Sequence, residues 1–232
     1  MGDTLALFDL DHTLLTGDSD TLWCDFLVAR GLLGPDFAER NAALAAGYRA
    51  GTVGVEAFCR FYAGTLAGRA LADWAPLLQD FLDEVLRPRI PAAAQALVRQ
   101  HRAQGHRLVL TSATNRVLAA PSAGELGFAE LLATDLAVDG AGRFTGELCG
   151  TPNMREGKVA RLQAWLAGQG LAPDEAGQAL ARAWFYSDSI NDLPLLLAVG
   201  HPVAVDPDPR LAQEAGQRGW PVLTLARDAH AP

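Results

Sequence analysis

The chain reads Thr4-Leu5-Ala6-Leu7-Phe8-Asp9-Leu10-Asp11-His12-Thr13 near its start, an apolar run that ends in two aspartates. Apolar and polar residues do not alternate in the run, which is typical of a strand buried on both faces, as in a parallel sheet. Asp9 and Asp11 then lie at the carboxyl end of the strand, where open α/β sheets bind ligands. A solvated turn would also explain two aspartates, because Asp is a common turn residue. This stretch alone leaves both interpretations open.

The bulk composition excludes several classes of protein. The 232 residues are 50% hydrophobic and carry a formal net charge of -8, with a sequence pI near 5.0. Such a chain can fill a proper core, and its negative charge argues against general binding to nucleic acid. Cys24, Cys59 and Cys149 follow no metal-ligand spacing and are expected to be reduced thiols. We find no signal peptide and no apolar run long enough to span a membrane, which indicates a cytoplasmic protein.

The basic residues are distributed unevenly between the two types. Of the 19 basic residues, only Lys158 is a lysine, and all others are arginine. Lysine is a compact point charge that serves well beside phosphate, whereas arginine is a planar fork. Chance explains a single lysine unless position 158 matters on other grounds.

Residues from about 19 to 87 show a helical pattern throughout. Aromatic and aliphatic residues recur at helical spacing, as in Phe58, Phe61 and Tyr62, and glycines separate four such segments. Two prolines at 88 and 91 mark the end of this region, since they cannot continue a helix. We therefore expect a core domain of residues 1–15 and 88–232, interrupted by a helical domain of residues 16–87.

After residue 91 the predicted elements alternate. We expect helices at 91–104, from 116 to about 127 and at 157–166, strands at 107–111, 184–186, 202–205 and 221–225, and a β-hairpin at 135–148. Alternating strands and helices predict a doubly wound parallel sheet with right-handed crossovers. The fold class is therefore α/β, with an inserted helical bundle.

Polar side chains follow several of these strands. Asp9 and Asp11 follow the first, Ser112 and Asn115 the second, and Asp188, Asn191 and Asp192 the third, while Lys158 opens a helix between the last two groups. In a doubly wound sheet these positions meet in one crevice. Several carboxylates there repel one another unless a cation intervenes, and Mg²⁺ binds one or two carboxylates together with waters and a phosphate. The sequence thus predicts a site for magnesium and a phosphate ester.

The sequence Asp9-Leu10-Asp11-His12-Thr13 resembles the first motif of the haloacid dehalogenase superfamily. Ser112, Lys158 and the run Ser187-Asp188-Ser189-Ile190-Asn191-Asp192 are similar to its other three motifs, in the right order. The helical insert is similar to the cap of the subfamily that contains phosphoserine phosphatases. The resemblance covers essentially the whole chain and implies a Rossmann-like core with a helical cap. It also gives position 158 a reason to be lysine.

The resemblance implies a phosphomonoesterase with an aspartyl-phosphate intermediate. Asp9 would be the nucleophile and Asp11 the general acid and base. Mg²⁺ would be held by Asp9, Asp188 and the backbone carbonyl of Asp11, with Asp192 and Asn191 orienting its waters and the phosphate. The phosphate-binding candidates are Ser112, Ala113, Lys158 and Asn191, and the metal candidates are Asp9, Asp11, Asp188 and Asp192.

Substrate choice is expected in the cap and near Asp18, which matches the acid that meets the substrate amine in phosphoserine phosphatases. The cap arginine of those enzymes is not matched, because Tyr62 occupies its place and Arg60 lies two residues away. An amino-alcohol phosphate without a carboxylate, such as histidinol phosphate, fits this pattern. The chain also resembles subfamily members with that assigned role at residues 18–20 (Asp-Ser-Asp) and 112–115 (Ser-Ala-Thr-Asn), and this resemblance makes histidinol phosphate the best candidate. Phosphoserine, a broader range of small phosphate esters, and transfer to another alcohol stay open. A noncatalytic phosphate- or metal-binding protein would be expected to lack one of the motif residues, and an EF-hand loop would need glycine where Leu14 stands.

Overall fold

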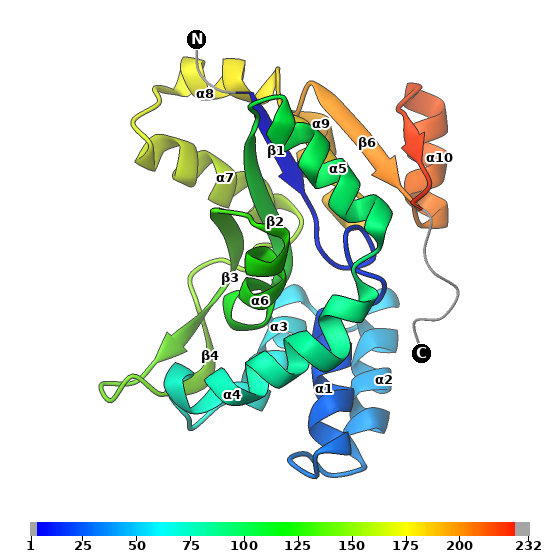
Figure 1. Cartoon of the computed structure of the whole chain (residues 1–232). Coiled ribbons are helices and arrows are strands. Elements are labelled where there is room, and N and C mark those ends of the chain that lie inside the picture. The colour runs from blue at the N-terminus through cyan, green and yellow to red at the C-terminus, as the bar shows by residue number, and fades with distance from the viewer. Residues whose placement is uncertain (1–3, 226–232) are drawn as a thin grey trace.

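The computed structural model describes residues 4–225, except for the side chain of Arg49. Within them a seven-stranded sheet has the order β4-β3-β2-β1-β5-β6-β7, and all pairs are parallel except β3 with β4. This confirms the predicted doubly wound α/β fold (Figure 1). The strands are β1 (Leu5–Phe8), β2 (Arg107–Asn115), β3 (Glu130–Val138), β4 (Phe144–Cys149), β5 (Trp184–Ser187), β6 (His201–Val205) and β7 (Val222–Leu223).

The central strand β1 is buried on both faces, which explains its uninterrupted apolar sequence. Ala6 and Phe8 belong to one apolar cluster, and Leu5 and Leu7 belong to another on the opposite face. The first face is covered by α5 (Ala92–Ala103) and α6 (Arg116–Leu126), and the second by α7 (Glu156–Gly168), α8 (Pro173–Leu180), α9 (Leu193–Ala198) and α10 (Pro209–Arg218). Helix α6 ends where Gly127 adopts a left-handed conformation with φ of 74°.

The helices that follow β1 are α1 (Ser19–Ala29), α2 (Phe37–Arg49), α3 (Val55–Ala63) and α4 (Leu71–Phe81). The last of the four expected helical segments is divided: a π-helical turn at Leu82–Leu86 and a 3₁₀ turn at Arg87–Arg89 follow α4. Pro88 lacks the amide hydrogen that an α-helix would need there. None of the helices within residues 4–225 has the length and apolarity that crossing a bilayer requires.

The helical insert and the sheet share apolar packing. One cluster contains Phe8 of β1 together with Trp23 of α1 and Trp74 and Phe81 of α4. The β3–β4 hairpin also reaches the insert, because the amide of Gly68 donates to the carbonyl of Phe144 at 2.8 Å and the Phe144 amide donates back to Arg69 at 3.0 Å. Figure 1 shows this hairpin extending away from the sheet to lie beside α4.

Two strands differ most from their predicted bounds. The strand expected at 107–111 continues to Asn115, with a shift of register between Ser112 and Asn115, so Ser112 is a strand residue and not a loop residue. The strand expected at 135–138 begins at Glu130, because its first half pairs with β2 and only its second half pairs with β4. Helix α8 lies in a region for which no element was predicted.

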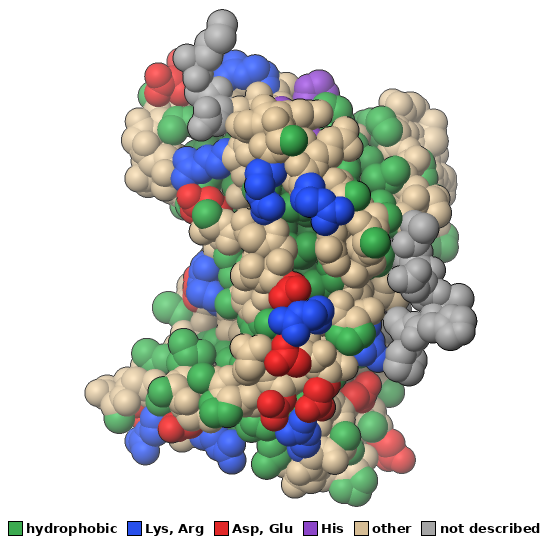
Figure 2. Space-filling model, viewed as in Figure 1, with side chains coloured by type: hydrophobic (Ala, Val, Ile, Leu, Met, Phe, Trp, Pro, Cys, Tyr) green, Lys and Arg blue, Asp and Glu red, His purple; other side chains and the backbone are tan. Residues whose placement is uncertain are grey.

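One face of the surface carries both signs of charge. Figure 2 shows acidic and basic side chains interspersed over the lower half of the molecule, on the side that α4 faces. Ion pairs there join Arg30 to Asp80 at 3.0 Å and to Glu84 at 2.7 Å. On this face the charges therefore offset one another, in contrast to the one-sign basic surface that binds nucleic acid.

Candidate active site

The first aspartate directly follows β1 and is held by the sheet. The amide of Asp9 donates to the carbonyl of Tyr186 in β5 at 2.9 Å, and the chain then turns tightly around the carbonyl of Leu10, which accepts from three amides. The side chain of Asp9 is only 9% exposed. The stretch is thus a turn, as one interpretation of the sequence required, but Asp9 within it is buried, which solubility alone does not explain.

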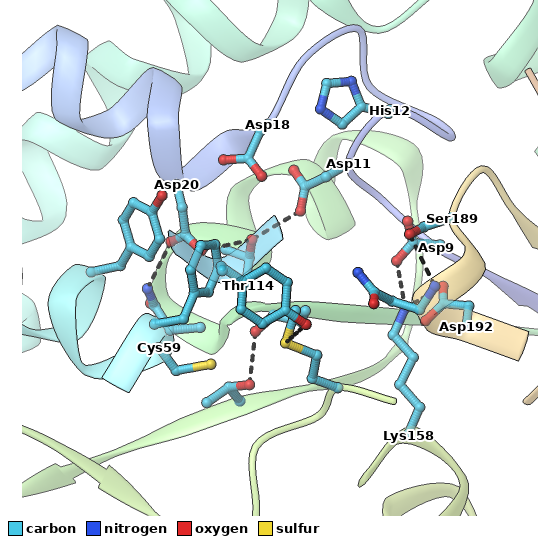
Figure 3. A pocket seen from close by; sticks show the side chains of 18 of the residues that line it. Asp9, Asp11, His12, Asp18, Asp20, Cys59, Thr114, Lys158, Ser189 and Asp192 are labelled. Carbon is cyan, nitrogen blue, oxygen red and sulfur yellow. Dashed lines mark hydrogen bonds and ion pairs between the residues drawn. The ribbon is translucent and has the colours of Figure 1, made fainter. Parts of the chain in front are cut away.

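Lys158 lies in the first turn of α7, as predicted, and its side chain is buried beside Asp9. Its Nζ atom is 2.7 Å from Asp9 Oδ1 and 2.7 Å from Asp192 Oδ2 (Figure 3). The preceding residue must be small: a Cβ atom on Gly157 would lie 2.0 Å from the carbonyl oxygen of Pro152. Glycine therefore allows the close approach of two backbone segments that sets the start of α7.

The electrostatics of this group are dominated by burial. Burial raises the pKa of Asp9 well above its usual value, Lys158 opposes the rise, and Asp192 and Asp188 add to it. Burial alone would lower the pKa of Lys158, but Asp192 and Asp9 raise it, so the lysine is charged at neutral pH. One buried ammonium thus lies among three carboxylates, and further positive charge would favour their ionised forms.

The residues fit a magnesium ion with few protein ligands. Thr13 Oγ1 lies 3.3 Å from Asp9 Oδ2 and 3.0 Å from Asp188 Oδ1, so these two carboxylates converge. Burial raises the pKa of Asp188 to about 6, with Asp192 adding to the shift. In residues 4–225 no three His, Cys, Asp or Glu side chains form a metal-ligand cluster. Mg²⁺ commonly takes only one or two carboxylates with waters and substrate oxygens, so Asp9 and Asp188 meet its needs.

Asp192 and Asn191 take different positions at this end of the site. Asp192 Oδ2 accepts from both Lys158 Nζ and Ser187 Oγ, each at 2.7 Å, so this oxygen is already satisfied within the protein. Asn191 lines the cavity and accepts a hydrogen bond from Arg155 at 3.3 Å. Asp192 is therefore less suited than Asp188 to hold a metal.

The side chain of Asp11 points toward the insert and not toward Lys158. Its carboxylate accepts from the amide of Ser19 at 2.7 Å, from Thr114 Oγ1 at 2.9 Å and from Ser112 Oγ at 3.2 Å. Figure 3 shows Asp11 beside Asp18, on the other side of the cavity from Asp192. Strand β2 thus brings Ser112 and Thr114 to Asp11, while Ala113 between them lines the cavity.

A cavity of about 320 Å³ connects these groups to the insert. Its far end carries Asp18 and Asp20, which open α1, and aromatic walls from α2 and α3. Burial raises the pKa of Asp18, with Asp11 adding to the rise, and burial together with Asp18 raises the pKa of Asp20 well above its usual value. Carboxyl groups thus lie at both ends of the cavity, and because their pKa values are raised, a bound cation would be needed to favour their ionised forms.

Two of the three predicted specificity residues line the cavity, and the third does not. Asp18 and Tyr62 line the cavity, and the Tyr62 hydroxyl donates to Asn41 Oδ1 at 2.8 Å. Arg60 does not line it: its guanidinium pairs with Glu147 at 2.8 Å and with Glu56 at 3.6 Å on the surface. Arg60 and Tyr62 lie two residues apart on α3, and that spacing turns them to different sides of a helix. Arg60 therefore lies outside the cavity, contrary to the prediction.

Several cavity residues were not predicted: Asp20, Tyr48, Phe58, Cys59, Thr114, Thr134 and Met154. A signal existed for Asp20, since Asp18-Ser19-Asp20 repeats the spacing of Asp9 and Asp11 at the start of a helix. No local pattern marks Tyr48 or Phe58, because aromatic residues at helical spacing are usually core. The cysteines are free thiols, as predicted, with Cys24 and Cys59 buried and Cys149 exposed.

The chain is similar to known proteins over most of its length. Residues 6–197 match the family model described as haloacid dehalogenase-like hydrolase. A histidinol-phosphatase of Neisseria meningitidis serogroup C is 38% identical over 95% of this chain and 98% of its own length. A phosphoserine phosphatase of Mycobacterium tuberculosis is 32% identical, with 97% and 72% covered. A crystal structure of a protein of unknown function from Bordetella pertussis Tohama I superposes with a TM-score of 0.89 at 44% identity, over 96% of this chain and 99% of that one.

A doubly wound sheet with a buried carboxylate–lysine pair at its carboxyl edge defines the protein as an α/β protein with a ligand-binding site at that edge. The chain belongs to the haloacid dehalogenase-like hydrolase family, since the family model covers most of its length. The two curated relatives described above are phosphatases by name. The resemblance seen in the four sequence motifs is thereby confirmed at the level of the family.

Proposed function

We propose that the protein is a Mg²⁺-dependent phosphomonoesterase in which Asp9 is the nucleophile. The observation that carries this proposal is the 2.7 Å contact between Lys158 Nζ and the buried carboxylate of Asp9 at the floor of a cavity. Asp9 would attack phosphorus in line, and the bond from phosphorus to the leaving oxygen would break. Lys158 stabilises the negative charge that spreads over the phosphoryl oxygens. Water then cleaves the aspartyl-phosphate and regenerates Asp9.

Asp11 is the proposed proton donor and acceptor. It lies two residues from Asp9 on the same turn, and both line the cavity. The hydrogen bonds from Ser19, Ser112 and Thr114 fix the orientation of its carboxylate. In this position Asp11 gives a proton to the departing alkoxide and later takes one from the attacking water.

Asp9 and Asp188 are the proposed metal ligands, together with the backbone carbonyl of Asp11. When bound, Mg²⁺ neutralises charge on the phosphoryl group and favours the ionised form of Asp9. Thr13 holds the two carboxylates in place, because its hydroxyl lies between them and accepts from the Asp188 amide at 3.0 Å. Ala113 and Asn191 line the cavity and are the proposed phosphate contacts, whereas the predicted Ser112 is fully buried, does not line it and donates its hydroxyl to Asp11.

The reaction is tested with a generic aryl phosphate. We expect turnover with added Mg²⁺, loss of turnover in EDTA, and a decrease of at least about a thousandfold for Asp9→Asn, which keeps the shape but not the nucleophile. Asp25→Asn is the matched control, because Asp25 is an exposed aspartate of α1 outside the cavity. Turnover that is insensitive to EDTA, or an active Asp9→Asn variant, would show that this mechanism is wrong.

The proposed substrate is histidinol phosphate, an amino-alcohol phosphate with an aromatic ring. The far end of the cavity offers Asp18 and Asp20 for a cationic group and the rings of Tyr48, Phe58 and Tyr62 for an aromatic one. Among the described residues that line the cavity there is no arginine. A substrate carboxylate would therefore meet carboxylates and not a guanidinium, which disfavours phosphoserine. The Neisseria relative bears the corresponding name.

The substrate is tested by phosphate release from histidinol phosphate, phosphoserine, phosphoethanolamine, nucleotides and sugar phosphates. We expect the highest kcat/KM for histidinol phosphate. Asp18→Asn should weaken that preference about tenfold while changing aryl phosphate turnover little, because asparagine still caps α1 at the amide of Thr21. A ranking led by phosphoserine would support the second relative's activity instead. Equal rates on sugar phosphates would contradict recognition of an amine.

A further inference from the structure

Arg155 has a backbone conformation that suits glycine better than arginine. Its φ is 53° and its ψ is -124°, directly before α7. A side chain at positive φ costs conformational energy, so such residues persist where the surrounding structure requires them, commonly at functional sites. Arg155 lies three residues before Lys158, and its carbonyl accepts from the Lys158 amide at 3.1 Å. The strain is therefore placed where the active-site lysine is positioned.

The guanidinium of Arg155 contacts two segments that are distant in the sequence. Its Cζ atom lies 5.1 Å from the centre of the Tyr48 ring in α2, a cation–π geometry. Its Nε atom donates to Asn191 Oδ1 at 3.3 Å, in the turn after β5. One half-buried side chain thus contacts both the insert and the carboxyl edge of the sheet.

Both partners of Arg155 line the cavity, whereas Arg155 does not. Tyr48 packs on Phe58 with ring centres 4.6 Å apart, and its hydroxyl donates to Met154 Sδ at 3.6 Å. Tyr48 is therefore a wall of the substrate end, and Asn191 belongs to the phosphate end. Arg155 lies outside the cavity and contacts one lining residue at each end, Tyr48 and Asn191.

We propose that Arg155 is a positioning residue that couples the Tyr48 wall to Asn191, so that seating the nonphosphate part of a substrate orders the phosphate end. The proposal rests on the proposed function, because it assumes that a phosphate ester fills the cavity. The substrate class it favours has a ring or chain long enough to meet Tyr48. Short phosphate esters would not engage the wall and would gain nothing from the coupling.

Two substitutions separate this role from a structural one. Arg155→Gly removes the side chain and also relieves the positive φ, so we expect a free energy of unfolding no lower than that of the wild type. Arg155→Met removes the charge but keeps the strain. In both variants kcat/KM for the preferred substrate should fall about tenfold, with kcat decreased and KM increased together. Arg218→Met is the matched control, because Arg218 also stacks on a ring, that of Trp220 at 5.4 Å, but on α10.

The coupling itself is measured with Tyr48→Leu and Asn191→Ala. With Arg155 present, the double variant should differ from the product of the two single effects on kcat/KM by about fivefold or more. In the Arg155→Met background the two effects should multiply simply. Nonadditivity that is the same in both backgrounds, or simple multiplication in both, would overturn the proposal.

A second measurement needs no catalysis. Amide hydrogen exchange should become faster in α2 (Phe37–Arg49) and at Ile190–Asp192 in both Arg155 variants, and should be unchanged in Arg218→Met. If the wild type hydrolyses no phosphate ester, the proposed function fails and the exchange result alone decides whether Arg155 couples the two segments. If turnover is present and neither segment changes in exchange, the coupling is wrong and the proposed function stands.

Discussion

The strongest stability prediction concerns the buried ion pair of Lys158. Its ammonium lies 2.7 Å from oxygens of both Asp9 and Asp192, and the three side chains are 2%, 9% and 5% exposed. Lys158→Met keeps most of the apolar stem but leaves two buried carboxylates without their cation. Breaking a buried pair in this way costs about 3–5 kcal/mol, because an uncompensated charge stays in a medium of low polarity. We expect a loss of that size in the free energy of unfolding near neutral pH.

The loss of stability in Lys158→Met should be smaller at acidic pH. Burial already raises the pKa of Asp9 and Lys158 opposes the rise, so without Lys158 the pKa of Asp9 in the folded state rises further above its unfolded value. The folded state then binds protons more readily than the unfolded one, so acidification stabilises the variant relative to the wild type. Urea unfolding in EDTA should therefore show a smaller difference between the two proteins at about pH 5 than at about pH 7.5.

A double variant tests whether unpaired charge causes this loss of stability. Lys158→Met combined with Asp192→Asn removes one unpaired charge, and we expect it to be more stable than Lys158→Met alone by about 1–3 kcal/mol. The reasoning fails if Lys158→Met loses less than about 1 kcal/mol near neutral pH. It also fails if the loss is independent of pH, because packing and not charge would then hold Lys158 in place.

Two further predictions concern stability away from the cavity. Burial, with a smaller effect of His106, lowers the pKa of His101 to about 4 from 6.5, so the unfolded chain binds a proton first as the pH falls and about 3 kcal/mol of stability should be lost between these values. Urea unfolding across that pH range should show a smaller loss of unfolding free energy on acidification for His101→Gln than for the wild type. An equal loss in the two proteins would show that His101 is not its cause. A Cβ atom on Gly200 would lie 1.8 Å from the Ala181 carbonyl oxygen, so Gly200→Ala should lower Tm at a cost of about 1–3 kcal/mol. Gly177→Ala in α8, where nothing lies within 4 Å, should leave Tm unchanged or raise it, and equal effects of the two substitutions would refute the packing argument.

The sheet and its catalytic edge were predictable because their signals are local. The apolar run before Asp9 identifies a buried strand, and Lys158 is conspicuous as the only lysine in the chain. Both residues are placed by elements whose periodicity is visible over a few positions. The family resemblance then connected them, since its motifs occur in a fixed order.

The features that were not predictable depend on contacts between distant segments. Nothing near Arg60 shows that it pairs with Glu147 instead of facing the cavity. The length of β3 depends on its having two different neighbours, and the contact of Arg155 with Tyr48 depends on how α2 packs. Periodicity describes which face of an element is apolar, but it does not describe which element will cover that face.

The hairpin that reaches the insert has a consequence for how substrate enters. Backbone hydrogen bonds join Gly68 and Arg69 to Phe144, and the shared apolar cluster runs from β1 into α4. These contacts attach the α1 and α4 side of the insert to the core. A rigid-body rotation of the whole insert away from the core would break both of them. Helices α2 and α3, which supply the aromatic walls, pack on α1 through a separate small cluster of Cys24, Phe37 and Tyr62. Helix α3 is also attached to the hairpin, because Arg60 pairs with Glu147 of β4 at 2.8 Å. Substrate should thus enter between α2 and the sheet edge, through a local displacement of α2 while the rest of the insert stays closed.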